Sequence, residues 1–353
     1  MEYFALYGLF LAKTITVVLV ISTLLLVVFS LRLRTRQRKG QIKIENLSKQ
    51  YRDRQREMQL ARLSEAEKAI WHKKQKKQDK KNEAKQVKLL TKSGVDAIAR
   101  SCLYVLDFIG SMNAVEVSSL REEITSVLSV AKSGDKVLLR LESPGGVVHG
   151  YGLAASQLQR LRKKGIQLII TVDKIAASGG YMMACVADQI ITAPFAIIGS
   201  IGVVAQIPNF NRLLKRNDID IELHTAGTYK RTLTLFGENS SSGREKFQQE
   251  LNETHQLFKS FVKCMRPNLD IDAVSTGEHW YGEQALHLGL VDAIGTSDEF
   301  LIEQLENHEV ISVRFTRPKR WMSCFTDNII LAFDQLFLSY WQYAKKLLYR
   351  KNY

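Results

Sequence analysis

A serine followed by two glycines separates a strand-like run from a helix-like run in TVDKIAASGGYMMACVAD, residues 171–188. This serine, Ser178, can act as a nucleophile if a base accepts its proton and backbone N–H groups stabilise the developing oxyanion. The glycines after it leave the backbone open, and Gly145 and Gly146 in ESPGG offer further backbone donors after an earlier strand. The competing interpretation makes Ser178 the N-cap of a helix beside a glycine turn. These residues alone leave both interpretations open.

Other hydrolytic arrangements exist in the sequence and are favoured less. Residues 129–136, SVAKSGDK, contain two S-x-x-K patterns of the kind found in penicillin-recognising enzymes, but the partner motifs S-D-N and K-T-G do not accompany them. We therefore expect a structural role for these serines and lysines. A Ser/His/Asp triad can be assembled from Ser178, His224 and Asp173, although no spacing singles it out.

Alternating strand and helix patterns from about residue 100 onward must position Ser178. Buried-strand patterns alternate with apolar residues at helical spacing, and a glycine or proline ends several of the segments. This order predicts an α/β domain with a largely parallel sheet and right-handed crossovers. The expected strands cover residues 101–110, 136–143 and 166–173, and the expected helices cover residues 115–132 and 152–165.

A membrane anchor is predicted at the amino terminus. Residues 14–31 form an 18-residue run without a charge, long enough to cross most of a bilayer. The run is followed by RLRTRQRK rather than by a small-residue cleavage site, which favours a retained single-pass anchor over a signal peptide. This basic flank predicts that the body of the protein lies on the cytoplasmic side. A second apolar run, residues 190–208, contains proline and glycines and is better explained by two buried strands around a turn.

The net charge of +14 belongs to one segment of the chain. Residues 32–92 hold 21 Lys and Arg against 7 Asp and Glu, so the remainder is balanced. No aromatic residues are interleaved with the lysines as a stacking platform, so we expect no nucleic-acid partner. We expect a basic, partly helical linker over residues 32–99, whose lysines rest on anionic lipid headgroups.

Four motifs together resemble the signal peptide peptidase A family of membrane-bound serine proteases, especially its shorter inner-membrane members with one catalytic unit. They are SPGG (143–146), DKIAASGGYMMACVAD (173–188), IIGSIGV (197–203) and YGEQALHLGLVD (281–292). The resemblance implies a Clp-protease/crotonase-like, parallel-sheet α/β fold. The domain boundaries that we expect are an anchor at 1–31, the linker at 32–99, a peptidase domain at 100–300, and a strand with an amphipathic helix at 301–353.

The same resemblance implies a Ser/Lys dyad. Ser178 matches the nucleophile and Lys230 the base, Gly146 and Gly179 match the oxyanion hole, and Ser200 matches the serine that orients the lysine. An amine accepts a proton only when neutral, so burial or nearby positive charge must lower the pKa of the base. No metal and no cofactor are implied.

The resemblance also implies substrates, partners and a location. Remnant signal peptides or unfolded, hydrophobic segments are the expected substrates, and a homo-oligomeric ring or dome is the expected assembly. The bacterial inner membrane is the expected site, with a periplasmic catalytic domain implied by the family and a cytoplasmic one by the basic flank. Two alternatives remain open: a crotonase-type acyl-CoA enzyme, which would need neither Ser178 nor Lys230, and a non-catalytic membrane-tethered scaffold.

Overall fold

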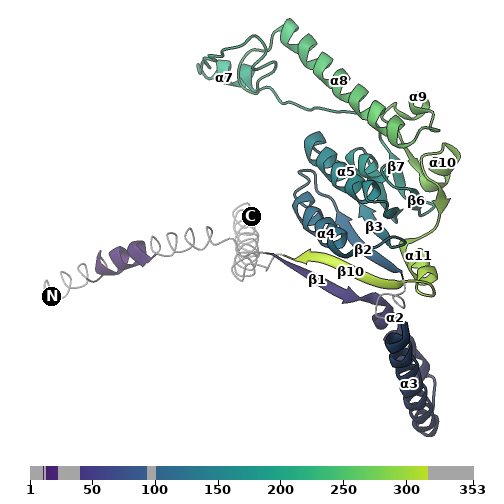
Figure 1. Cartoon of the computed structure of the whole chain (residues 1–353). Helices are drawn as coiled ribbons and strands as arrows, with labels where there is room; N and C mark the ends of the chain where they lie inside the picture. Colours follow the sequence, from purple (N-terminus) through teal and green to yellow (C-terminus); the bar gives the residue numbers. More distant parts are fainter. Residues whose placement is uncertain (1–10, 12, 23–39, 94–100, 317–353) are drawn as a thin grey trace, which may run out of the picture. The chain divides into compact units, whose positions relative to one another are not determined.

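The computed structural model describes residues 11, 13–22, 40–93 and 101–316 (Figure 1). The chain divides into two compact units, one of residues 42–315 and one that combines residues 1–41 with 316–353.

In the second of these units, residues 13–22 are helical. No helix within the described ranges is both long and apolar enough to span a bilayer. The other residues of the predicted anchor (1–10, 12 and 23–31) and the predicted C-terminal amphipathic helix lie outside the described residues.

A seven-stranded sheet forms the centre of the larger unit, and the predicted mixed α/β fold with a mainly parallel sheet is confirmed. Every pairing from β10 through β9 is parallel, with Leu106 opposite Leu139 in the register of the two central strands. The strand order is β1 (Gln41–Asn46), β10 (Glu309–Thr316), β2 (Cys102–Ile109), β3 (Lys136–Glu142), β4 (Gln167–Val172), β6 (Gln189–Thr192) and β9 (Ala293–Ile294).

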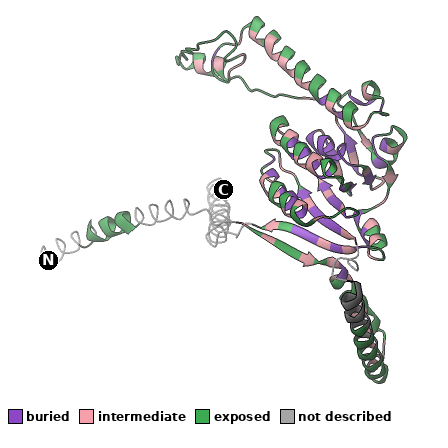
Figure 2. Cartoon of the chain, in the orientation of Figure 1, coloured by how far each residue is buried: buried purple, intermediate pink, exposed green. Residues whose placement is uncertain are grey.

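Helices cover both faces of this sheet, which explains why its strands are apolar on both sides. Leu106 and Leu139 belong to one core together with residues of α4 (Val117–Val130) and α5 (Val148–Lys163). Their neighbours Val105 and Leu138 belong to a second core that is closed by α11 (Ser297–Gln304). Figure 2 shows the buried residues concentrated in the central strands.

A small second sheet carries the candidate nucleophile. It consists of β5 (Ile175–Ala177), β7 (Ile197–Gly199) and β8 (His279–Tyr281), with β5 parallel to β7. Helix α6 (Gly179–Ala184) follows β5 after one residue, and α10 (Gly282–His287) follows β8 directly. The apolar run 190–208 contains β6 and β7, so its interpretation as two strands is confirmed.

The predicted linker is more structured than the sequence indicates. Helices α2 (Leu47–Ala61) and α3 (Glu65–Ser93) confirm its helical part. Strand β1 was not predicted, because its sequence QIKIEN is mostly polar and the strand lies at the sheet edge with most residues exposed. Ser48 at the start of α2 fixes this segment, since its Oγ accepts a hydrogen bond from the N–H of Val310 at 2.8 Å.

A long segment, residues 203–240, connects β7 to the long helix α8 (Ser241–Met265). We call this segment the arm. It contains one short helix, α7 (Asn211–Arg216), and every residue from 215 to 231 is exposed. The later part of α8 is anchored on the α/β body, where Phe258 and Val262 are buried, and α9 (Ile271–Val274) follows it.

Candidate active site

Ser178 occupies a strained turn between β5 and α6. Its φ of 52° and ψ of −117° lie in a region that side-chain-bearing residues rarely adopt. Its N–H donates to the carbonyl of Gly199 at 2.8 Å, and its own carbonyl accepts from the N–H of Met182 at 2.9 Å. The side chain forms no capping hydrogen bond to α6 and is partly exposed. The N-cap interpretation therefore does not describe what this hydroxyl does, and strain held in place by surrounding structure is typical of functional sites.

The glycine loop after β3 packs directly against this turn. Gly145 has a φ of +89°, and a Cβ on it would lie 2.8 Å from Cβ of Ser178 and 2.7 Å from the carbonyl of Ala177. Its N–H donates to Oγ of Ser143 at 3.1 Å, so the expectation that Gly145 offers an unencumbered donor is wrong. The N–H of Gly146 has no acceptor within the described residues and remains available.

Gly179 supplies a second available donor. It is the first residue of α6, and the first N–H groups of a helix have no partner within it. A Cβ on Gly179 would lie 2.4 Å from Cγ of Tyr151, so only glycine fits. Backbone N–H groups close to a partly exposed serine hydroxyl constitute the arrangement that stabilises an oxyanion.

Ser200 lies close to Ser178, at the same end of the small sheet. Ala177, the last residue of β5, is paired with Gly199, the last residue of β7, so Ser178 and Ser200 directly follow the ends of two paired strands. Ser200 also has a positive φ, 51°, and its N–H donates to the carbonyl of Glu278 at 2.7 Å. Four of the five predicted site residues are thus brought together.

Lys230, the fifth, lies in the arm. It is exposed, and its backbone N–H donates to the carbonyl of Gly227 at 3.1 Å. Its neighbour Tyr229 lies under Nζ of Lys246, 5.6 Å from ring centroid to nitrogen, which ties this stretch to the first turns of α8. Among the residues that the structure describes, no hydrogen bond joins Lys230 to Ser178. The dyad stays a prediction.

The alternative triad does not form. Both carboxylate oxygens of Asp173 accept hydrogen bonds from Ser297, at 2.8 Å from its N–H and 2.5 Å from its hydroxyl. His224 lies in the arm, exposed and 3.4 Å from the carboxylate of Glu222. The hydroxyl of Ser129, in the first S-x-x-K pattern, donates to the helix carbonyl of Ser126 at 2.7 Å, as a structural serine does.

Sequence reasoning missed the buried polar groups behind the glycine loop. Ser143 and Tyr151 are fully buried, and their hydroxyl oxygens lie 2.6 Å apart. The position of Ser143 directly before Pro144 and two glycines was the only signal in the sequence, and it was interpreted as a strand end. Tyr151 lies one residue before the predicted helix 152–165 and had no signal of its own; in the structure it belongs to the first turn of α5.

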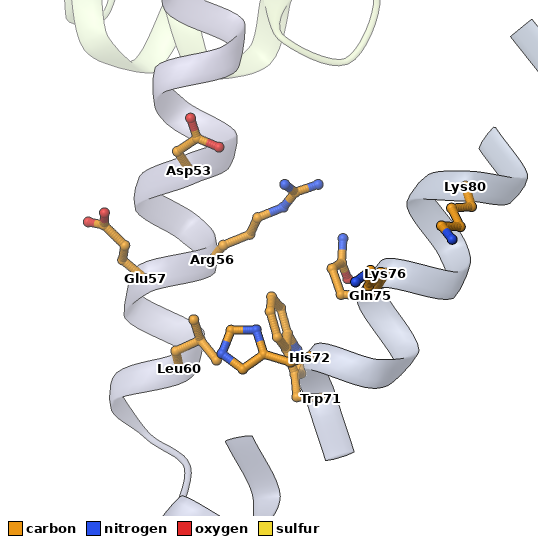
Figure 3. A pocket seen from close by; sticks show the side chains of 9 residues that line it. All are labelled: Asp53, Arg56, Glu57, Leu60, Trp71, His72, Gln75, Lys76 and Lys80. Carbon is orange, nitrogen blue, oxygen red and sulfur yellow. The ribbon is translucent and has the colours of Figure 1, made fainter. Parts of the chain in front are cut away.

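A groove of about 730 Å³ lies elsewhere, between α2 and α3 (Figure 3). Arg56 and Gln75 project into the space between these helices from opposite sides. The groove shares no residue with the Ser178 turn, so its polar lining describes a surface of the basic segment rather than the catalytic candidate. The lining residues are Asp53, Arg56, Glu57, Leu60, Trp71, His72, Gln75, Lys76 and Lys80.

Comparison with known proteins decides the family. The family model described as "Peptidase family S49 N-terminal" matches residues 2–158, and that described as "Peptidase family S49" matches residues 160–311. The chain belongs to peptidase family S49. It is therefore a peptidase, of the serine type that the family implies, and the resemblance that the four motifs indicated is confirmed. The acyl-CoA enzyme and the scaffold lose their support.

Individual S49 relatives cover nearly the whole chain. "Probable protease SohB" of Haemophilus influenzae is 50% identical over 90% of this chain and 91% of its own length. "Probable protease SohB" of Buchnera aphidicola subsp. Acyrthosiphon pisum is 52% identical over 98% of both chains. The predicted resemblance thus extends over nearly the full length of the chain. A solved membrane-bound stomatin-specific protease covers 63% of this chain at 16% identity with a TM-score of 0.41, too low for any conclusion.

Proposed function

We propose that this S49 peptidase is a membrane-anchored serine endopeptidase in which Ser178 is the nucleophile and Lys230 the general base. The observation that carries the proposal is the strained turn at Ser178, where a hydroxyl free of capping bonds adjoins the available N–H groups of Gly146 and Gly179. Strain of this kind costs about 1–3 kcal/mol and persists where function requires it.

The reaction follows from these roles. Neutral Lys230 accepts the proton of the Ser178 hydroxyl as Oγ bonds to the scissile carbonyl carbon, and the N–H groups of Gly146 and Gly179 stabilise the oxyanion. The carbon–nitrogen bond then breaks, and the lysine returns the proton to the leaving amine. Water attacks the acyl-enzyme with the same lysine as base, which releases the acid and regenerates Ser178. In this proposal, Ser200 orients the lysine.

In this proposal, assembly into a homo-oligomer brings Lys230 to the nucleophile. The arm exposes large apolar side chains, with Val204 91% and Phe236 47% exposed, and a monomeric protein seldom leaves so many uncovered in one segment. We propose that the arm packs on a neighbouring copy and thereby brings Lys230 next to a Ser178 hydroxyl. Mixing the inactive variants Ser178→Ala and Lys230→Ala should then restore part of the activity, because some assembled sites combine one intact residue from each copy.

Membrane attachment is proposed from the amino-terminal segment. The uncharged run 14–31 is the anchor, and exposed lysines of α3, among them Lys73, Lys77 and Lys81, rest on anionic headgroups. The bacterial inner membrane fits this layout. The basic flank after the run favours a cytoplasmic catalytic domain, and remnant signal peptides or unfolded hydrophobic segments are the substrates that such a location supplies.

The test is hydrolysis of casein and of a remnant signal peptide by the full chain in detergent. Ser178→Ala and Lys230→Ala should each lower kcat by about 10⁴-fold or more, since members of a catalytic unit fail together. The matched controls are Ser129→Ala, which removes a structural serine, and Arg231→Ala, which removes the exposed cation next to Lys230. Full hydrolysis by Ser178→Ala refutes the nucleophile, and full hydrolysis by Lys230→Ala refutes the base.

A further inference from the structure

We propose that Tyr151 is a positioning residue for the oxyanion-binding backbone groups, and that it acts through Ser143. The proposal rests on the proposed role of Ser178 as nucleophile. In it, the side chains of Tyr151 and Ser143 hold the loops around Ser178 in position.

A chain of hydrogen bonds with a fixed direction connects these groups. The Tyr151 hydroxyl donates its single proton to the carbonyl of Ser111 at 2.9 Å. Because that proton is used, the 2.6 Å contact between the two hydroxyls must have Ser143 as donor and Tyr151 as acceptor. Oγ of Ser143 in turn accepts from the N–H of Gly145 at 3.1 Å. Each hydroxyl therefore both donates and accepts, and neither can reverse without breaking a bond.

Tyr151 thereby joins three loops that meet at the carboxyl ends of their strands. Its hydroxyl bonds to Ser111 in the loop after β2 and to Ser143 in the loop after β3. Its ring carbons lie against Gly179 in the turn after β5, where an added Cβ would approach Cγ to 2.4 Å. One side chain from the first turn of α5 thus touches the loop after β2, the glycine loop after β3 and the start of α6, and the last two carry the proposed oxyanion donors.

Burial makes this arrangement rigid. Tyr151 and Ser143 are both 0% exposed, so a hydroxyl that lost its partner would not find water in its place. Burial, together with the charge of Glu116, raises the pKa of Tyr151, which keeps the phenol protonated as a donor. A Cβ at Gly110 would lie 2.5 Å from the Tyr151 oxygen, so the loop after β2 also closes directly over the hydroxyl.

Loss of these hydrogen bonds should weaken stabilisation of the transition state and leave substrate binding largely unchanged. Ser143 holds the N–H of Gly145, and the next residue, Gly146, carries one of the two available oxyanion donors. On the other side, Val147 is held by its N–H to the carbonyl of Met112 at 3.0 Å. Without the hydroxyl chain, only the Val147 side of the loop stays fixed, and the Gly146 donor loses its alignment with the N–H of Gly179. Misplaced oxyanion donors lower kcat and leave KM largely unchanged.

The experiment compares single-atom changes in the full chain. Tyr151→Phe removes only the hydroxyl and keeps the ring against Gly179, and Ser143→Ala removes the intermediate hydroxyl. The control is Tyr104→Phe, which removes another buried phenol hydroxyl near the opposite end of β2, beside Cys102 and Asp135. For each variant we would measure kcat and KM for a peptide, inhibition by a peptide aldehyde whose hemiacetal carries the oxyanion, and the melting temperature.

Both site variants should lower kcat about 10- to 100-fold and weaken the aldehyde by the same factor, with KM within about twofold. The double variant should be no worse than the poorer single one, since the hydroxyls act as one unit. Tyr104→Phe should keep its kcat. If Tyr151→Phe and Ser143→Ala fold and keep wild-type kcat while Ser178→Ala is inactive, the positioning role is overturned and the proposed function stands. If Tyr104→Phe loses as much kcat as the two site variants, the positioning role is overturned as well. Activity that survives Ser178→Ala overturns the proposed function, and this proposal with it.

Discussion

Replacing Gly145 by alanine perturbs the contact between the glycine loop and the Ser178 turn most directly. The φ of Gly145 is +89°, which costs an L-residue about 1–2 kcal/mol on its own. The added Cβ would also lie 2.7 Å from the Ala177 carbonyl and 2.8 Å from the N–H nitrogen of Gly179. These are backbone atoms that cannot rotate away, so the crowding adds about 1–3 kcal/mol. Gly145→Ala should therefore lower the free energy of unfolding by about 2–5 kcal/mol in total.

Gly134 provides a matched control for this substitution. It has nearly the same φ, +93°, but nothing lies within 4 Å of the Cβ that alanine would add. Gly134→Ala should therefore show the backbone strain alone, and the difference between the two variants isolates the crowding at the Ser178 turn. Urea unfolding of the two variants measures this difference, and peptide hydrolysis should be lost only in Gly145→Ala. If the two variants unfold at the same urea concentration, the close packing that we describe is wrong.

The remaining predictions concern stability. Burial raises the pKa of Glu123 from 4.5 to about 7, so between these values the folded protein holds a proton that the unfolded chain has released. The free energy of unfolding should thus fall as the pH rises through that window, by about 1–3 kcal/mol relative to the variant Glu123→Gln. This variant is a suitable control because its amide oxygen can still accept from the N–H of Phe315. If urea titrations near pH 5 and pH 8 give the same difference in unfolding free energy between the wild type and Glu123→Gln, the prediction is contradicted. Arg266→Ala should cost about 1–3 kcal/mol in the same assay, because Arg266 forms two 2.8 Å hydrogen bonds to the carboxylate of Asp292. An unchanged urea midpoint would show that this ion pair is not stabilising.

Most of the fold could be predicted because its strands and helices have clear apolar periodicity. The buried strands β2, β3 and β4 are nearly continuous apolar runs, and α4 has an apolar stripe, so both patterns are strong. Strand β1 was missed because pairing with β10, rather than its own composition, makes QIKIEN extended. The short strand β5 has only three residues and gave no periodicity to detect.

The candidate site divides in the same way. The sequence presents Ser178, Gly146 and Gly179 as candidates because they follow strands, and the family resemblance supplied their roles; a parallel bridge between Ser143 and Ala176 brings the two segments together. The role of Gly145 was wrong because its N–H is used by a buried hydroxyl that lies next to it only in the folded chain. Tyr151 was missed for the same reason, because its three contacts come from loops that are distant in sequence. Lys230 came from the family resemblance alone, since an exposed lysine has no local signature.

The most direct test of the central claim is to find which residue a fluorophosphonate modifies. The detergent-solubilised full chain would be treated with the probe, digested, and searched by mass spectrometry for the phosphonylated peptide. We predict a single adduct on Ser178 in the segment TVDKIAASGGYMMACVAD, absent from Ser178→Ala and strongly reduced in Lys230→Ala. An adduct on a different serine, or undiminished labelling of Ser178→Ala, would contradict the assignment of Ser178 as the nucleophile.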